Sequence, residues 1–444
     1  MTPVSRRRFL NASAIGVAGA AFAIHRAGAA PSDTVRFGLI GVGGRGRGLA
    51  LTVARRPDCE CIYLCDPDAR RAAGSMGKRL TPKGGTLPKP VADFRTALDD
   101  KNLDAVIVAT PDHWHALATV LACCAGKDVY VEKPASYSIW EGRQMVKAAR
   151  KHKRVVQVGL QNRTCPYIHK AIDYIRSGKL GRIPLVKVFN IKGGGPFRKA
   201  NDTAPPKGVD YDMWLGPAPK RPFNPRHFHG GWYYLYDYCG GDMGNDASHQ
   251  IDIARWLIGK AAPTSATCYA GHHAWDDDRE VPDTQTAAFD FGDCVMTFDN
   301  TQYARYMAKV PGAVRNADKF PHWPLCATRI ELYGTREKMI LGRHGAGWQA
   351  FTSGGKVTAQ QYGRQAQKEH PDNWIDCIRS RKRPNADIED GHLSAALSHL
   401  GNISYRVGQR QLLYDPATET ITNHPDANRL VKREPRPPYT FPKL

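Results

Sequence analysis

The chain has 444 residues, of which 42% are hydrophobic and 24% are charged, and its formal net charge at pH 7 is +21. This composition is typical of a globular protein long enough for two domains, and it excludes disordered and collagen-like chains. No stretch after residue 30 approaches the roughly 20 continuous apolar residues of a membrane-spanning helix, and the basic residues are spread too evenly to predict nucleic-acid binding.

Residues 1–30 predict a twin-arginine export signal. The segment Ser5–Leu10 holds three consecutive arginines, an Ala/Gly-rich stretch covers Ala12–Ile24, and the small residues of Ala27–Ala30 suit cleavage. No cysteine ends the signal, so we expect no stable membrane anchor. We therefore expect a periplasmic or otherwise exported protein, with the twin-arginine export machinery as a partner.

From residue 33 to residue 160, strand and helix patterns alternate. An apolar strand at Thr34–Ile40 leads through a glycine-rich turn into a helix that ends near Arg55. Such alternation is typical of a parallel, doubly wound sheet of the α/β class. The further elements predicted here are strands at Glu60–Cys65, Ala105–Ala109, Asp128–Val131 and Val155–Gly159, helices at Ala92–Leu98, His113–Ala125 and Ile139–His152, and a loop over 74–90.

After residue 160 the pattern changes, and residues 161–430 predict an α+β domain for substrate binding and oligomerisation. Strand-like runs follow one another here without alternating helices, which favours a mostly antiparallel open sheet. Residues 431–444 are predicted to form a proline-rich arm, and the arm and an exposed sheet face favour a homo-oligomer. The elements are strands Leu185–Ile191, Thr284–Phe291, Val295–Asn300 and Thr328–Tyr333, helices Pro166–Ser177, Asp246–Leu257, Asn373–Arg379 and Gly391–Val407, and loops over 193–225 and 308–324.

The segment Gly41–Gly46 carries a GxGxxG pattern between a predicted strand and a predicted helix. Gly41 permits the tight turn, Gly43 lets the backbone approach a pyrophosphate, and Gly46 permits close helix–strand packing. The free N–H groups at the start of the helix then face the phosphates. Asp66 ends the next strand, where its carboxylate can accept ribose hydroxyls. The pattern therefore predicts a bound dinucleotide, NAD rather than NADP, although two arginines shortly after Asp66 leave NADP open.

Two further segments carry groups for proton transfer. A Glu-Lys-Pro tripeptide around Lys133 follows a strand, and ligands of parallel sheets gather at the carboxyl ends of strands. In Gly240–Asp252, Asp246 and His249 have the spacing of neighbours on one helix face, which favours a histidine that relays a proton. A surface turn and a structural histidine are the alternative interpretations. The aromatic run just upstream of this segment can stack on a sugar ring or pack in the core.

The chain resembles the glucose-fructose oxidoreductase / inositol dehydrogenase / MocA family over nearly its whole length after residue 33. The resemblance rests on Val35–Gly46, Ala109–His115, Ala125–Pro134, Gly240–Asp252 and Asp376–Pro384. It implies a Rossmann domain that binds a nicotinamide dinucleotide and a second domain that binds a sugar or polyol. In the family an aspartate usually lies four residues before the catalytic histidine, and this chain departs from the pattern there.

The resemblance and the motifs together predict the site. Asn245 takes the place of the family's aspartate, with Asp246 one step on, so either Asp246 substitutes for it or this branch does without the carboxylate. No metal site is expected. The predicted cofactor-binding residues are Gly41, Gly43, Gly44, Arg45, Gly46, Asp66, Thr110, Pro111, His115, Glu132, Lys133 and Gln161, the catalytic residues are Lys133, Asp246 and His249, and the substrate-binding residues are Trp232, Tyr236 and Asn245.

The expected function is a nicotinamide-dependent oxidoreductase that acts on a secondary hydroxyl of a sugar or cyclitol. Outside the cytoplasm little free NAD is present, so the cofactor should stay tightly bound and be recycled in place. An NAD-dependent glycosidase, which oxidises a ring carbon transiently, eliminates the aglycone and reduces the ring again, is the alternative enzyme. A non-catalytic ligand-binding protein of the same fold and, more distantly, a nucleic-acid binder are the alternatives from other classes.

Overall fold

Six parallel strands form the N-terminal sheet of the computed structural model, which describes residues 34–82 and 84–444. The strand order is β3-β2-β1-β4-β5-β6. Strands β1 to β3 are therefore added toward one edge of the sheet and β4 to β6 toward the other, and the order switches between β1 and β4. Both faces are covered, and Phe37 and Leu39 of β1 are fully buried. The strands are β1 (Val35–Ile40), β2 (Cys59–Cys65), β3 (Lys89–Val91), β4 (Ala105–Val108), β5 (Asp128–Val131) and β6 (Val156–Val158).

Helices on both sides of this sheet confirm the predicted doubly wound architecture. The long helix α6 begins where the sequence gives a capping signal, because the Ser138 hydroxyl accepts a hydrogen bond from the Glu141 backbone N–H at 3.3 Å. The helices are α1 (Gly44–Val53), α2 (Ala69–Ala72), α3 (Met76–Leu80), α4 (Arg95–Leu98), α5 (Asp112–Cys124) and α6 (Ile139–Lys151).

The segment predicted as a loop over 74–90 contains the short helix α3 and the start of β3, so that prediction was wrong in part. Met76 and Leu80, four residues apart on one helix face, are both buried against the sheet. A helix of one turn presents too few apolar positions to show a period in the sequence. The helix predicted at Ala92–Leu98 is shorter in the structure, where α4 covers Arg95–Leu98.

Ten strands form the C-terminal sheet, in the order β14-β13-β12-β11-β7-β10-β9-β8-β15-β16. Only β7 and β10 pair in parallel within it, which confirms a mostly antiparallel sheet. Its strands are β7 (Leu185–Ile191), β8 (Ser265–Gly271), β9 (Thr284–Asp290), β10 (Val295–Thr301), β11 (Arg329–Tyr333), β12 (Lys338–Gly342), β13 (Trp348–Phe351), β14 (Val357–Gln361), β15 (Leu412–Asp415) and β16 (Thr420–Ile421).

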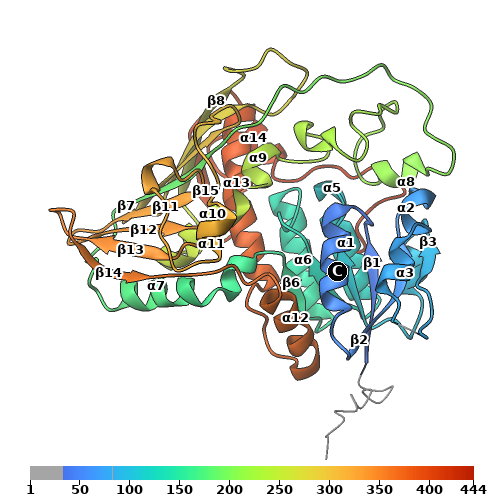
Figure 1. Cartoon of the computed structure of the whole chain (residues 1–444). Coiled ribbons are helices and arrows are strands. Elements are labelled where there is room, and N and C mark those ends of the chain that lie inside the picture. Colours follow the sequence, from blue (N-terminus) through green and yellow to red (C-terminus); the bar gives the residue numbers. More distant parts are fainter. Residues whose placement is uncertain (1–33, 83) are drawn as a thin grey trace, which may run out of the picture.

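Helices pack on one face of this sheet, and α13 lies between the two sheets in Figure 1, where it contacts both α6 and β8. The core of this half is formed by residues such as Ile251, Phe289 and Leu400, all fully buried. The helices and 3-10 turns are η2 (Gln161–Thr164), α7 (Pro166–Arg176), α8 (Tyr211–Leu215), η3 (Gly231–Tyr234), α9 (Gly241–Gly244), α10 (Ser248–Ile258), α11 (Gly312–Arg315), η4 (Trp323–Leu325), α12 (Glu369–Ser380), α13 (Ile388–Arg406) and α14 (Pro425–Arg429).

Two C-terminal segments return to the N-terminal sheet. Trp374 of α12 is fully buried in the same core cluster as β1. In the arm of residues 431–444, Arg433 binds Glu141 of α6 at 2.6 Å and Arg436 binds Asp212 of α8 at 2.7 Å. The arm therefore ties the long segment that carries α8 to the Rossmann domain.

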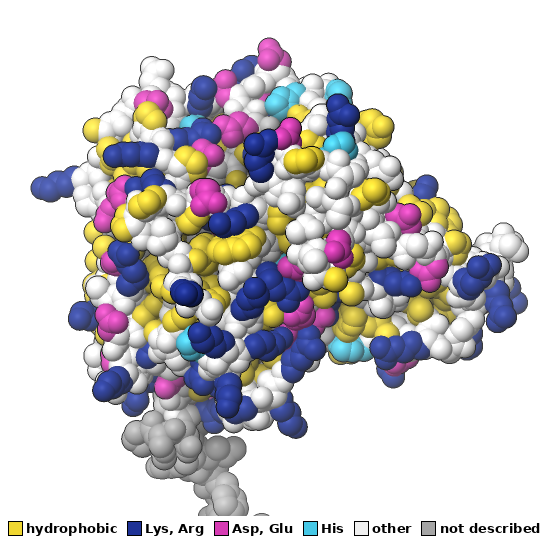
Figure 2. Space-filling view, turned by 180° about the vertical axis from the view of Figure 1, so that it is seen from behind, with side chains coloured by type: hydrophobic (Ala, Val, Ile, Leu, Met, Phe, Trp, Pro, Cys, Tyr) yellow, Lys and Arg dark blue, Asp and Glu magenta, His cyan; other side chains and the backbone are white. Residues whose placement is uncertain are grey.

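The predicted export signal, residues 1–30, lies outside the described residues. Within the described part of the chain, no helix combines the length and apolar character needed to cross a bilayer. Lysine and arginine side chains are scattered over the face seen in Figure 2, with acidic side chains between them, rather than gathered in one stripe.

Candidate functional site

A cavity of about 580 Å³ opens at the carboxyl ends of the parallel strands, between the N-terminal sheet and the C-terminal half. Most of the predicted site residues line it together. Gly46, Asp246 and Tyr236 lie outside its lining. The predicted residues in its wall are Gly41, Gly43, Gly44, Arg45, Asp66, Thr110, Pro111, His115, Glu132, Lys133, Gln161, Trp232, Asn245 and His249.

Backbone forms the wall of the cavity beside α1. Gly41 has a φ of +92°, and a Cβ there would lie 2.6 Å from the carbonyl oxygen of Ala109. A Cβ on Gly46 would lie 2.2 Å from the Gly41 carbonyl oxygen. The helix can therefore pack this closely on the turn only because Gly46 has no side chain. The N-cap residue Gly43 provides no side-chain cap, which leaves the first N–H groups of α1 available to an anion.

Asp66 lies where a ribose would follow that phosphate cradle. Its two oxygens accept hydrogen bonds from the backbone N–H groups of Val42 at 2.9 Å and Asp68 at 3.0 Å. The side chain is buried, which raises its pKa. Arg71 lines the same part of the cavity, whereas Arg70 is drawn away by an ion pair with Asp68 at 2.8 Å.

The Glu-Lys-Pro segment turns its charged groups in opposite directions. The Glu132 carboxylate binds Nε of Arg45, a residue of the first turn of α1, at 2.7 Å. The Lys133 Nζ donates to the backbone oxygen of Asn245 at 2.9 Å and also to its side-chain oxygen. His115 steadies the segment, because its ring nitrogens lie 2.7 Å from the Pro134 carbonyl oxygen and 3.0 Å from that of Thr110.

Asp246 does not hold His249. Its carboxylate binds Lys192 at 2.7 Å and Lys309 at 2.6 Å, with Arg343 at 3.7 Å. Burial opposes ionisation of Asp246, but these three cations outweigh it and keep the pKa well below its ordinary value. The helix α10 begins at Ser248, so Asp246 precedes it and the expected helical spacing to His249 does not apply.

His249 lines the cavity as a neutral ring. Burial, followed by the positive charges of Arg343 and Lys133, lowers its pKa well below the ordinary value. Its Nδ1 is buried and has no hydrogen-bond partner among the described residues, and the same holds for the Thr110 hydroxyl. Such unpartnered groups beside a glycine cradle and a buried carboxylate fit a bound dinucleotide and a hydroxylated substrate.

The aromatic run divides between the cavity and the protein interior. Trp232 lines the cavity. Tyr236 lies elsewhere, with the guanidinium of Arg406 4.8 Å from its ring centre. Tyr233 and Tyr234 line a second hollow of about 370 Å³. A contact between Tyr236 and a ligand in the main cavity is therefore not part of this arrangement.

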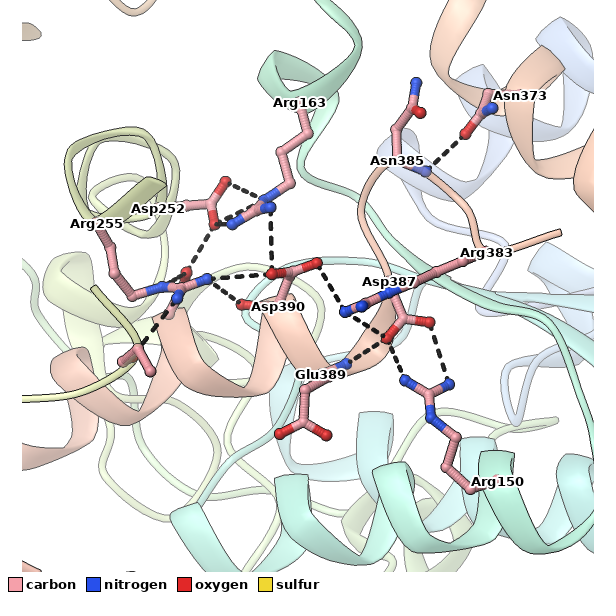
Figure 3. A network of polar contacts seen from close by, with 12 residues as sticks. Arg150, Arg163, Asp252, Arg255, Asn373, Arg383, Asn385, Asp387, Glu389 and Asp390 are labelled. Atoms are coloured by element: carbon pink, nitrogen blue, oxygen red, sulfur yellow. Dashed lines mark hydrogen bonds and ion pairs between the residues drawn. The ribbon is translucent and has the colours of Figure 1, made fainter. Parts of the chain in front are cut away.

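A buried ion network, drawn in Figure 3, fixes the two segments that bring Gln161 and His249 to the cavity. Arg163 of η2 binds Asp252 of α10 at 2.8 Å, and their side chains are 4% and 0% exposed. Asp390 of α13 joins the network 3.4 Å from Arg163. Removing one partner of such a pair leaves a buried charge unpaired, which is strongly destabilising. The network therefore holds η2 and α10 in one arrangement.

Several cavity residues were not assigned to the site by the sequence analysis, and most of them lie in segments that carry no motif. Arg343 and His344 follow β12 in a turn bounded by glycines, and Arg315 ends the one-turn helix α11. An Arg-His pair flanked by glycines (Gly342 and Gly345) is the signal that could have pointed to the first two. The other cavity residues missed include Pro67, Arg71, Phe94, Asp112, Trp114, Met213, Trp214, His229, Gln365 and Gln367.

Family comparison covers both halves of the chain. A family model described as "Oxidoreductase family, NAD-binding Rossmann fold" (GFO_IDH_MocA) matches residues 35–160. A second, described as "Oxidoreductase family, C-terminal alpha/beta domain" (GFO_IDH_MocA_C2), matches residues 192–300 and 334–441.

Among curated proteins, the chain is similar to the levoglucosan dehydrogenase of Pseudarthrobacter phenanthrenivorans. The two are 27% identical over 241 residues, which are 53% of this chain and 54% of that protein. The inositol 2-dehydrogenase of Rhizobium meliloti is 28% identical over 243 residues, 53% of this chain and 58% of that protein. The match thus spans little more than half the length of these relatives.

Solved structures share the fold over nearly their whole length. The WlbA dehydrogenase of Bordetella pertussis, in complex with NADH and UDP-GlcNAcA, aligns with a TM-score of 0.60 and 22% identity over 86% of this chain and 99% of that chain. The aldose-aldose oxidoreductase of Caulobacter crescentus, complexed with glycerol, aligns with a TM-score of 0.62 and 17% identity over 86% and 99%.

Proposed function

Because this chain belongs to the GFO_IDH_MocA oxidoreductase family, with its NAD-binding Rossmann fold, we propose that it transfers hydride at a secondary hydroxyl of a sugar or cyclitol. The names of the levoglucosan and inositol dehydrogenases support that substrate class. NAD is the cofactor of the family's Rossmann domain, and the residues of the cavity fit it.

One observation carries the proposal: Lys133 and His249 reach the same cavity as the glycine cradle and Asp66. Bound in that cavity, NAD supplies the hydride acceptor. Lys133 binds the substrate hydroxyl and takes its proton, while the two oxygens of Asn245 hold its Nζ in place. The ring of His249 can donate a hydrogen bond to the same or a neighbouring hydroxyl, or accept one from it, and stays neutral because its pKa is lowered.

Export and cofactor retention belong to the same proposal. The arginine-rich segment Ser5–Leu10 supports transport by the twin-arginine machinery. A protein that works outside the cytoplasm needs its dinucleotide retained, and a backbone cradle without side chains between helix and phosphates favours a long-lived complex. Retention means that each oxidation is followed by a reduction in the same cavity.

The experiment is to purify the protein, denature it and identify any released nucleotide, and then to incubate the native protein with polyols, sugars and glycosides. We expect NAD in the supernatant and two products, a new ketose or lactone and the reduced form of a second sugar that takes the hydride back from the bound nucleotide. A free reducing sugar at an unchanged oxidation level would instead identify the glycosidase chemistry. Protein that neither carries nor takes up a pyridine nucleotide would overturn the proposal.

A further inference from the structure

Two arginines from the C-terminal half of the chain line the cavity. Arg343 lies in the turn after β12 and is 8% exposed, and Arg315 ends α11 and is half-buried. In each side chain the Nε is buried and has no hydrogen-bond partner within the described residues. A buried guanidinium with unused donors is a costly arrangement unless a ligand completes it.

The charge of this pair is not balanced by the protein. Arg343 lies 3.7 Å from Asp246, but that carboxylate is already bound by Lys192 at 2.7 Å and Lys309 at 2.6 Å. Arg315 donates to the backbone oxygen of Val310 at 3.1 Å and makes no ion pair in the described part of the chain. The C-terminal wall of the cavity therefore carries excess positive charge.

The excess positive charge reaches the catalytic groups. The positive charge of Arg343 is close enough to His249 to lower the pKa of that ring. At the cradle, by contrast, Arg45 is neutralised by Glu132 at 2.7 Å, and the first N–H groups of α1 supply the donors for a pyrophosphate.

We infer that Arg315 and Arg343 form an anion subsite, and that the substrate is a sugar or polyol bearing a carboxylate or a phosphate ester. The anion binds the two guanidinium groups, and the reacting hydroxyl faces Lys133 and His249. Gln365 also lines the cavity beside Arg343, whose backbone oxygen accepts a hydrogen bond from the Gln365 amide at 3.4 Å, and the second N–H of that amide is a neutral donor. This inference rests on the proposed function, because it names the class of substrate for that same cavity.

The first test measures binding to the protein as purified, by titration calorimetry at about 0.15 M salt, where exposed charges are largely screened. The probes are matched sets: D-glucose, D-glucuronate and D-glucose 6-phosphate, and the corresponding galactose compounds. We expect at least one anionic member to bind about tenfold or more tightly than its neutral counterpart, as hydrogen bonds to a charged group allow. A uronate preference identifies a carboxylate, and a sugar-phosphate preference identifies a phosphate ester.

Three variants locate the preference. Arg315→Gln removes a half-buried charge, and Arg343→Gln removes the buried one. Arg364→Gln is the control, since it removes the same charge from a side chain that is 64% exposed and outside the cavity lining. We expect the first two to lose about tenfold to a hundredfold of the affinity for the anionic sugar, with unchanged nucleotide content, and the control to lose none.

The inference is overturned if the neutral sugars bind as tightly as the anionic ones, if no anionic sugar binds, or if the preference survives Arg315→Gln. Release of the nucleotide from Arg315→Gln or Arg343→Gln would also overturn it, because the arginines would then hold the cofactor. That result would leave the proposed function intact. Absence of any pyridine nucleotide from the wild-type protein would instead remove the proposed function, so the two failures are distinguishable.

Discussion

The two walls of the cavity are built from different materials. Beside α1 the N-terminal wall is backbone, with Gly41 and Gly43 in the turn and the open end of α1 behind them. The C-terminal wall consists of side chains on segments far apart in the sequence, and two of them, Arg343 and Arg315, are charged. Adding an atom should damage the first wall, whereas removing a charge should damage the second.

Lys133, which lies between the two walls, should show the largest effect. Lys133→Met removes the group that takes the proton, and we expect turnover to fall about 10²- to 10⁴-fold, the usual range for a general base. Nucleotide content should stay unchanged, because the cradle is untouched. Lys147→Met, at an exposed position of α6, is the matched control for turnover and nucleotide content. Full turnover in the Lys133 variant would mean that proton transfer runs through another group.

Asp246→Asn should destabilise the fold by about 3 kcal/mol at pH 7, because among the described residues it leaves Lys309 and Arg343 without a carboxylate and Lys192 with Asp242 alone. The pKa of Asp246 is lower in the folded than in the unfolded chain, so its stabilisation is present above an unfolded pKa of about 3.9 and is lost as pH falls further. Denaturant unfolding at pH 7 and near pH 3 measures the difference.

Asp318→Asn provides the control for that comparison, because Asp318 is 70% exposed and 3.8 Å from its partner Arg364. We expect its effect on the free energy of unfolding to be within a few tenths of a kcal/mol at both pH values. An Asp246→Asn protein as stable as the wild type at pH 7 would show that Arg343 of the C-terminal wall tolerates the loss of the carboxylate behind it. That result would contradict the comparison of the two walls.

Gly46→Ala tests the backbone wall. The added Cβ would lie 2.2 Å from the Gly41 carbonyl oxygen, so the turn must shift, at a cost of about 1–3 kcal/mol in stability. We also expect the protein to be purified with less nucleotide. In the same helix, a Cβ on Gly48 meets nothing within 4 Å, so Gly48→Ala should instead stabilise by up to about 1 kcal/mol. Equal nucleotide retention in both variants would contradict the role given to the turn.

The same contrast between walls decides how much the sequence could predict. Alternating strands and helices indicated the Rossmann half, and the glycine pattern with Asp66 indicated its cavity wall, because each rests on local backbone requirements. The strands β8 and β12 to β16 escaped prediction. Several of them are short and β14 is largely exposed, so their apolar alternation is weak.

The relation between two predicted site residues was wrong because it depended on the exact residue at which a helix begins. Asp246 and His249 share a face only if both are helical, and α10 begins between them at Ser248. Arg315 and Arg343 reach the cavity through contacts between α11 and the turn after β12, where a Cβ on Gly345 would lie 3.0 Å from the Arg315 carbonyl oxygen. Such tertiary contacts join segments far apart in the sequence, and no local pattern in the sequence indicates that they meet.

The smallest expected effect lies at Asn245, where this chain departs from the family's aspartate. Asn245→Asp places a carboxylate where the side-chain oxygen now accepts the Lys133 hydrogen bond, and a negative charge favours the ammonium form. The rising limb of the pH–rate profile should therefore move to higher pH. Asn245→Ser, which keeps a neutral oxygen, should lower the rate without moving the limb. A profile that does not move in Asn245→Asp would mean that the limb reports a group other than Lys133, and the amide would then serve only to position the lysine.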